Sequence, residues 1–320
     1  MKLNLKPTAL LAAAFVLGAS LSASAQTVAI GSNPQGSAAY ATASAIAKVV
    51  SDNSELRMRV VPQGGPVVTI PMVAAGEMEF SVANSLPVFF AQNGGAMFSE
   101  TSHPETKMVA ALYNLNVGFF VRADSDIYTL EDLRGRRVST EFTQQRVLHT
   151  MQTAILATAG MTIDDLEGVP VPSGGRGVDD FVAGRVDAGL FSVGSGAVLQ
   201  ADAAVGGIRF IPVPLTEEAQ AALVARAPGS YIEELAPAEG RAGIEEPIGV
   251  FAGPFLIVAS DNTPEEMVYE VTRLIHQNGP ALQSAAPQFA NFDPAGMAPD
   301  LNIELHPGAI RYYTEIGLME

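Results

Sequence analysis

The sequence of 320 residues contains no cysteine and no tryptophan. Without cysteine, disulfides, thiolate nucleophiles and cysteine-ligated metal sites are excluded. The four histidines are far apart and in no metal-ligand spacing: His103, His149, His276 and His306. The sequence therefore predicts no metal site.

Basic residues are also scarce, with 18 Lys and Arg against 34 Asp and Glu and a net charge of −16. No basic stripe is visible, so we predict no nucleic-acid partner. The acidic balance indicates solubility more than a ligand, because a local site can still be positive. With 48% hydrophobic residues, 30 Gly and 21 Pro, the chain has a globular composition and enough length for one large or two moderate domains.

Catalytic motifs are missing as well. Gly194-Ser195-Gly196 lacks the flanking residues of a nucleophile elbow, and the sequence has no phosphate-loop lysine and no dinucleotide fingerprint. The acid pairs Asp164-Asp165 and Asp179-Asp180 lie at predicted helix starts, where acids cap helices. We predict a protein that is not an enzyme and that has no cofactor.

Residues 1–25 have the pattern of a signal peptide. Lys2 and Lys6 precede an apolar run from Ala9 to Leu21 that is too short to span a bilayer. Ala23-Ser24-Ala25 is an A-x-A cleavage site. We therefore expect a periplasmic protein that is cleaved near Ala25, and we exclude these residues from the predicted fold.

The stretch from Thr27 to Val50 sets the pattern for the rest of the chain. A short apolar strand, Val28 to Ile30, leads into a Gly/Ser turn and then an Ala-rich helix. The first N–H groups of a helix are unpaired and its dipole adds positive charge there, so this point suits an anion. An ordinary turn capped by Ser37 is the alternative interpretation.

The same alternation of strand, loop and helix repeats along the chain. Strands are predicted over 57–61, 80–83, 108–112, 117–121 and 255–260. Alternating strands and helices predict an α/β fold with parallel sheets, in which ligands lie beyond the carboxyl ends of the strands. Uncharged loops follow three of the strands, at 32–37, 63–65 and 84–85. A further helix is predicted over 143–159.

Several stretches resemble the TAXI family of solute receptors, which serve one class of TRAP transporter. The similar blocks run from about Thr27 to Gly317, and together are more specific than any one alone. They read IGSNPQGSAAYATASAIAKVV, VPQGGPVVTIPMVAAGEMEFSVANS, LEDLRGRRVS, VAGRVDAGLFSVGSG and HPGAIRYYTEIG.

The resemblance implies a type II periplasmic-binding-protein fold, with two α/β lobes closing on a ligand in a cleft between them. Family members bind amino acids such as glutamate or related dicarboxylates and deliver them to a fused, ion-gradient-driven membrane permease. Three segments depart from the family pattern and change residues expected near the ligand: Ala38-Ala39-Tyr40, Val68-Thr69 and Thr140 to Arg146.

On this basis we expect lobe I to comprise 26–117 and 259–320, and lobe II to comprise 118–258. We expect a monomer whose partners are a small organic anion and a fused TRAP permease. The candidate ligand-binding residues are Ser32, Asn33, Gly36, Ser37, Tyr40, Gln63, Gly64, Gly65, Asn84, Ser85, Thr140, Arg146 and Ser192.

Each candidate also has a plainer interpretation. Arg146 lies in the first turn of a predicted helix, where a cation opposes the helix dipole and invites an anion, yet it could pair with Glu141 or be solvated. Tyr40 could line the cleft or pack in the core. The neutral residues could cap helices or form turns. Phe142 and Phe191 could stack on a ligand, although packing is the default.

Two alternative functions are compatible with the same fold. One is a binding protein of an ABC importer, and the other is a periplasmic sensor module that presents its closed form to a receptor kinase. An exported hydrolase or lyase would need a nucleophile or a metal site, which the sequence does not show.

Overall fold

The computed structural model describes residues 26–98, 101–290, 292–301 and 303–319. The predicted signal peptide lies outside these residues. The strands are β1 Gln26–Ser32, β2 Leu56–Pro62, β3 Phe80–Asn84, β4 Thr106–Arg122, β5 Arg137–Glu141, β6 Glu167–Val171, β7 Ala188–Ser192, β8 Ile208–Phe210, β9 Tyr231–Leu235 and β10 Ile248–Ser260.

The helices are α1 Ala38–Asn53, α2 Pro66–Ala74, α3 Ser85–Asn93, α4 Arg146–Ala157, α5 Gly174–Val182, α6 Gly196–Val205, α7 Glu217–Val224, α8 Glu265–Gln277, α9 Gly279–Ala285 and α10 Pro307–Glu315. Short 3-10 helices cover Ala96–Phe98, Glu131–Leu133, Ile163–Asp165, Pro287–Phe289 and Pro294–Gly296.

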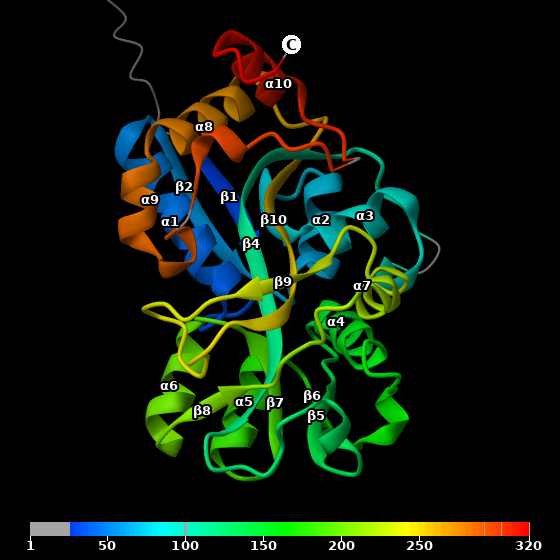
Figure 1. Ribbon diagram of the computed structural model, residues 1–320. Coiled ribbons are helices and arrows are strands. Elements are labelled where there is room, and N and C mark those ends of the chain that lie inside the picture. The colour runs from blue at the N-terminus through cyan, green and yellow to red at the C-terminus, as the bar shows by residue number, and fades with distance from the viewer. Residues whose placement is uncertain (1–25, 99–100, 291, 302, 320) are drawn as a thin grey trace, which may run out of the picture.

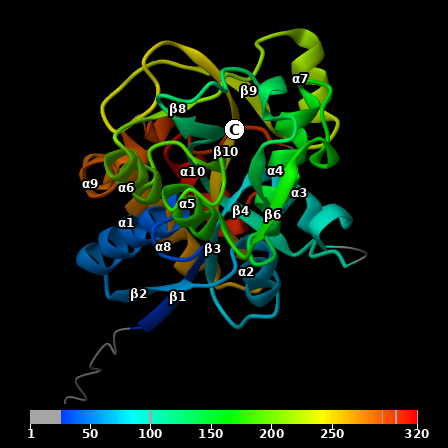
Figure 2. The ribbon, with the colours of Figure 1, turned by 90° about the horizontal axis from the view of Figure 1, so that it is seen from below.

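A continuous sheet runs through both lobes in the order β2-β1-β3-β10-β4-β7-β5-β6, with β8 paired to β4 and β9 paired to β10. The predicted α/β fold with two lobes is confirmed, but the sheet is mixed and not parallel throughout, because β4 and β10 run antiparallel to their neighbours. In Figure 1 the upper lobe holds β1, β2 and α1 on one side and α2 and α3 on the other, while α4, α5 and α6 lie in the lower lobe. Figure 2 shows the lower lobe in front, with β4 and β10 passing behind it.

Two long antiparallel strands connect the lobes. β10 pairs with β3 over Phe255–Ala259, whereas β4 pairs with β7 over Val117–Val121. The two strands pair with each other from Phe251↔Val117 to Ser260↔Thr106. The predicted lobe limits, 26–117 with 259–320 and 118–258, stay a prediction about which parts move together.

The separate strands predicted over 108–112 and 117–121 are one strand. β4 continues without interruption through Tyr113–Asn116, the polar stretch that suggested a break. These residues keep their partners on β10, and the irregular register beside Phe255 takes up the mismatch. Pairing therefore outweighed the weak strand pattern of this stretch.

The helix predicted over 143–159 begins later, at Arg146, and ends at Ala157. Glu141 and Phe142 adopt left-handed backbone angles, with φ of 67° and 46°. Since helical residues need negative φ, the chain turns there before α4 can start. Arg146 is thus the first helical residue, and it lies in the first turn of the helix, as the sequence predicted.

The apolar faces of the helices fill the space against the sheet. In lobe I, Ile46 and Val50 of α1 are fully buried beside Ile30 of β1. In lobe II, Met151 and Ile155 of α4 are buried in a second cluster. Among the described residues, no helix is long and apolar enough to cross a membrane.

Protonation of His306 makes the stability of the fold depend on pH. This residue caps α10: its Nδ1 accepts a hydrogen bond from the backbone N–H of Gly308 at 3.1 Å, which needs an unprotonated nitrogen. Burial lowers the pKa of His306, outweighing the opposing effect of nearby backbone groups and of Asp261.

We therefore predict that the wild-type protein loses stability as pH falls below about 6.5, the pKa of an unfolded histidine. The unfolded chain takes up the proton first, so the loss grows until pH reaches the folded pKa. One proton limits the slope to about 1.4 kcal/mol for each pH unit. His306→Asn keeps a capping oxygen but cannot titrate. Melting temperatures of both proteins between pH 5 and 8 should diverge toward low pH, and parallel curves would contradict the prediction.

Candidate ligand-binding cleft

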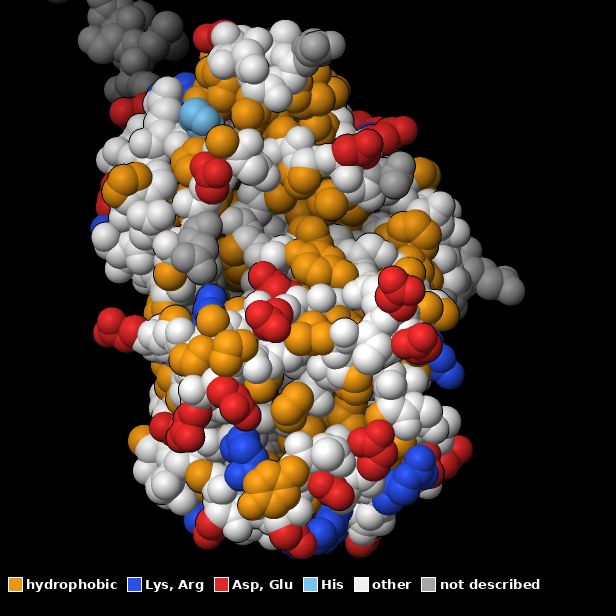
Figure 3. All heavy atoms as spheres, in the orientation of Figure 1, with side chains coloured by type: hydrophobic (Ala, Val, Ile, Leu, Met, Phe, Trp, Pro, Cys, Tyr) orange, Lys and Arg blue, Asp and Glu red, His pale blue; other side chains and the backbone are white. Residues whose placement is uncertain are grey.

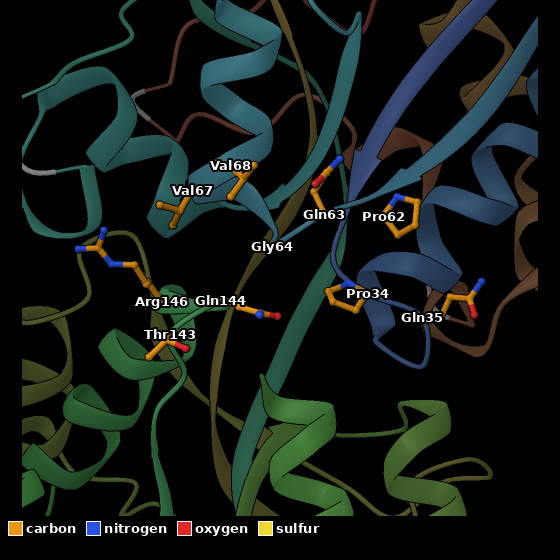
Figure 4. A pocket seen from close by; sticks show the side chains of 10 residues that line it. All are labelled: Pro34, Gln35, Pro62, Gln63, Gly64, Val67, Val68, Thr143, Gln144 and Arg146. Atoms are coloured by element: carbon orange, nitrogen blue, oxygen red, sulfur yellow. The ribbon is translucent and has the colours of Figure 1, made fainter. Parts of the chain in front are cut away.

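A wide opening lies between the two lobes, and we call it the outer mouth. Its volume is about 770 Å³. Loops after β1 and β2, together with the start of α2, face the segment before α4 (Figure 4). The lining residues are Pro34, Gln35, Pro62, Gln63, Gly64, Val67, Val68, Thr143, Gln144 and Arg146.

Deeper between the lobes lies a small cavity of about 40 Å³, which we call the inner chamber. It shares Gly64 with the outer mouth. Its lining comes from both lobes: Asn33, Ser37, Ala38, Ala39, Gly64, Pro66, Asn84, Leu115, Gln145, Val147, Leu148, Met151, Phe191, Ser192 and Phe255. Together the two spaces form the candidate ligand-binding cleft.

The lobes touch each other beside this cleft. The backbone N–H of Ala197, on α6, donates to the carbonyl oxygen of Gly36 at 3.4 Å. A Cβ atom on Gly64 would lie 2.7 Å from the carbonyl oxygen of Gln144 in the opposite lobe. The two lobes are therefore in direct contact beside the cleft.

Several predicted residues lie on the cleft. Asn33, Ser37, Asn84 and Ser192 line the inner chamber. Gln63 and Arg146 line the outer mouth, and Gly64 belongs to both. The uncharged loops after β1, β2 and β3 thus meet at one point, as their positions at the ends of these strands suggested.

Many polar groups of this set already bond within the protein. Ser37 Oγ donates to the carbonyl of Pro34 and accepts from the N–H of Tyr40. Asn84 Oδ1 caps α3 by accepting from Leu86 N–H, while its Nδ2 donates to the carbonyl of Gly253. Their plainer interpretation as capping residues is therefore confirmed, and little of their hydrogen-bonding capacity is left for a ligand.

Other predicted residues lie outside the linings of both cavities. Ser32 Oγ donates to the carbonyl of Asn33, and Ser85 Oγ to that of Gly229. The Tyr40 hydroxyl accepts from Gln35 Nε2 at 3.2 Å. Thr140 is buried, with its side chain facing Gly168 of β6. Gly36 and Gly65 instead provide turns with φ of 86° and 85°, angles that favour glycine.

Arg146 is exposed at the rim of the outer mouth. Figure 4 shows its side chain extending away from Gln144 and Gln63. Within the described part of the chain its guanidinium has no ion-pair or hydrogen-bond partner, so it does not pair with Glu141. It is the only charged residue in the described linings of mouth and chamber.

Sequence reasoning missed the apolar wall of the chamber. Leu148 and Met151 come from α4, and Phe255 comes from β10, each almost completely buried. Their helical or strand spacing marked them as core residues, and nothing in the sequence distinguishes a core face from a cleft wall. Phe191, considered as a stacking residue, does line the chamber, whereas Phe142 is packed in the core.

Gln145 is a further residue that the sequence did not single out. It is buried on the chamber wall, directly before α4. Its Oε1 accepts a hydrogen bond from the N–H of Gly174 at 2.6 Å, so it connects the start of α4 to the start of α5. The Nε2 atom has no hydrogen-bond partner in the described residues.

A second cavity, of about 600 Å³, lies beside β9 and the loop that follows it. Glu233 of β9 accepts from Asn116 Nδ2 at 2.7 Å and from Asn114 Nδ2 at 3.5 Å. Burial and the neighbouring Glu233 raise the pKa of Tyr231 to about 12. Arg241 also lines this cavity. In Figure 3, which shows the face that carries β9, acidic side chains are scattered and basic ones lie mostly in the lower half.

The described residues contain no group of three or more His, Asp or Glu side chains that could hold a metal ion. His306 and His276 are engaged elsewhere, with Gly308 and Tyr312. Neither cavity of the cleft is lined by a histidine or a carboxylate among these residues.

A family model described as the NMT1-like family matches residues 30–317. The chain belongs to this family. The match covers both lobes, from the end of β1 through α10.

Solved structures share the fold at low sequence identity. One described as a periplasmic transporter has 17% identity and a TM-score of 0.58, covering 91% of this chain and 93% of its own. MatC from Rhodopseudomonas palustris, solved with malate, has 14% identity and a TM-score of 0.57, covering 91% and 97%. An R. palustris protein solved with adipate has 15% identity and a TM-score of 0.57, covering 92% and 94%.

The contact at Gly64 yields a test of closure. In Gly64→Ala the new Cβ would clash with the backbone of Gln144 across the cleft. The arrangement with the lobes in contact should therefore become about 1–3 kcal/mol less stable relative to the separated one, while each lobe keeps its fold. Gly175→Ala is the matched control, because nothing lies within 4 Å of a Cβ there.

Because the chain lacks cysteine, spin labels can be placed selectively at Asp52→Cys and Asp179→Cys, exposed sites on α1 and α5. Electron-spin distance measurements should show the short-distance population reduced about tenfold in Gly64→Ala and unchanged in Gly175→Ala. Identical distributions in the two variants would argue against direct contact of the lobes at Gly64.

Proposed function

We propose that this protein is a periplasmic solute-binding receptor that captures a small organic anion by closure of its two lobes. The observation that carries the proposal is a cleft lined from both lobes by Asn33, Gln145, Arg146 and Ser192, residues with unused polar capacity. Binding groups on both sides of a cleft favour the closed form, because a ligand then gains contacts that the open form lacks.

The comparisons support the same class of function. Structures of similar fold were solved with malate and with adipate, both small organic acids. The A-x-A pattern at Ala23-Ser24-Ala25 favours export to the periplasm. We propose that 26–117 with 259–320 and 118–258 are the bodies that move, with β4 and β10 as the hinge.

The resemblance of the sequence blocks to TAXI receptors further favours delivery to a fused TRAP permease. An ABC-importer role and a sensor role remain the alternatives. Uptake into vesicles that contain such a permease should depend on this protein and on an ion gradient, without ATP. A requirement for ATP would favour the ABC importer, and activation of a receptor kinase without uptake would favour the sensor.

The first test of binding is a thermal-shift screen of residues 26–320 against amino acids, keto acids, monocarboxylates and dicarboxylates. A ligand at about a thousand times its Kd adds roughly 4 kcal/mol of stability, which raises Tm by several degrees in a chain of this size. At least one acid should give such a shift, and a flat screen across all four classes would oppose the proposal.

Arg146 is proposed to attract the anion at the rim of the mouth. Arg146→Gln should raise the Kd of the best acid from the screen about three- to tenfold, because an exposed charge pair contributes about 1 kcal/mol. It should also flatten the dependence of association rate on salt. The control is Arg176→Gln on α5, where the exposed Arg176 pairs with Asp180 away from the cleft. Equal effects of the two substitutions would place the anion elsewhere.

A further inference from the structure

The inner chamber is apolar and carries no charge. Leu148, Met151, Phe191 and Phe255 are the large apolar side chains that its two lobes share, and each is at most 7% exposed. None of the fifteen described lining residues is Asp, Glu, Lys, Arg or His. Arg146 is the one charged residue on the described lining of the adjoining outer mouth, whereas the second cavity, which shares Ala38 and Leu115 with the chamber, carries both acidic and basic residues.

The polar side-chain atoms of the chamber are few once internal hydrogen bonds are counted. Ser37 and Asn84 are occupied as helix caps. Asn33 Oδ1 is buried with no partner in the described residues, and it is an acceptor, which repels a carboxylate oxygen. The Nδ2 of Asn33, the hydroxyl of Ser192 and the Nε2 of Gln145 complete the unused set of side-chain atoms, and all three are neutral donors.

These features of the chamber distinguish acids with a carboxylate at the inner end from acids with an uncharged inner end. A carboxylate moved into an apolar space without a cation loses several kcal/mol of solvation, and the three neutral side-chain donors offset only part of this loss. Burial of a methyl or methylene group in the same place instead contributes about 0.8 kcal/mol to the free energy of binding. The free space of about 40 Å³ admits only a short chain without further opening.

We infer that the ligand is a short-chain monocarboxylic acid, with its carboxylate on the Arg146 side of the cleft and its uncharged carbon chain in the inner chamber. The inference rests on the proposed function and narrows its ligand class. It separates this chain from similar structures solved with malate or adipate, which carry a carboxyl group at each end. An uncharged donor such as a hydroxyl on the chain could additionally bond to Asn33 Oδ1.

The experiment compares acids that differ only at the inner end. Calorimetric titration of the mature protein would use 2-oxopentanoate against 2-oxoglutarate, norvaline against glutamate, and pentanoate against glutarate. In each pair that binds, the methyl-terminated acid should have a Kd at least tenfold lower. If the dicarboxylate binds more tightly, the inference is wrong while the proposed function stands. If no pair binds and the wider screen is flat, the proposed function is wrong as well.

Substitutions in the inner chamber then test whether the carbon chain of the ligand ends there. Met151→Lys places a cation in the chamber and should reverse the preference toward the dicarboxylate, while Met151→Leu should keep the wild-type preference. Met151 is 1% exposed, so Leu148→Gln is a second variant if the lysine prevents folding. Leu148→Gln should raise the Kd of the methyl-terminated acid about tenfold and change the Kd of the dicarboxylate by less than a factor of two.

The second cavity provides the control, because Arg241 is a cation that lines it and not the chamber. Arg241→Ala should leave both affinities unchanged. A loss of acid binding in Arg241→Ala together with no effect at Met151 and Leu148 would move the site to the second cavity and overturn the inference.

Discussion

The antiparallel pairing of β4 with β10 is the constraint on which both lobes depend. Each of these two strands belongs to the sheet of one lobe and then to the sheet of the other. Neither lobe therefore has a complete sheet without the pair. At its centre Gly253 and Pro254 face Leu115 and Asn114. Proline has no N–H to give to a ladder, so Pro254 donates no hydrogen bond to the pairing at its centre. A bend there would move the lobes while leaving the pairing within each of them intact.

The same geometry determines which chemical groups can reach a ligand. The loops after β1 and β3 end at helix starts, so Ser37 and Asn84 bond to the N–H groups of their own helices. A capping oxygen satisfies a group that would otherwise be unpaired, and this competes with ligand contact. The unused groups on the cleft are consequently few, and the apolar side chains of α4 have a larger part in shaping it.

The entry to α4 illustrates how the cleft is held in shape. Glu141 and Phe142 both have left-handed backbone angles, which cost non-glycine residues roughly 1–2 kcal/mol each. Full burial of the Phe142 ring offsets this cost, and Gln145 connects the turn to Gly174. The turn sets the direction of Val147, Leu148 and Met151 toward the chamber.

The sequence by itself determined the alternation of strands and helices, the cap at Ser37, and the meeting of neutral loops at one end of the sheet. These features follow from local periodicity and turn chemistry, which act between residues close in the chain. Its one misplaced break, at Tyr113–Asn116, lies where pairing with a strand far along the chain overrides a weak local pattern.

Only the tertiary structure decided which polar residues face the cleft and which serve the fold. A serine or asparagine at a loop end can cap a helix or bind a ligand with the same atoms, so its type does not choose between them. The side chain of Thr140 faces Gly168, and that of Ser85 bonds to Gly229. Both partners lie in segments that are distant along the chain. The uncharged chamber likewise exists only because Leu115, Met151, Phe191 and Phe255 meet across the two lobes.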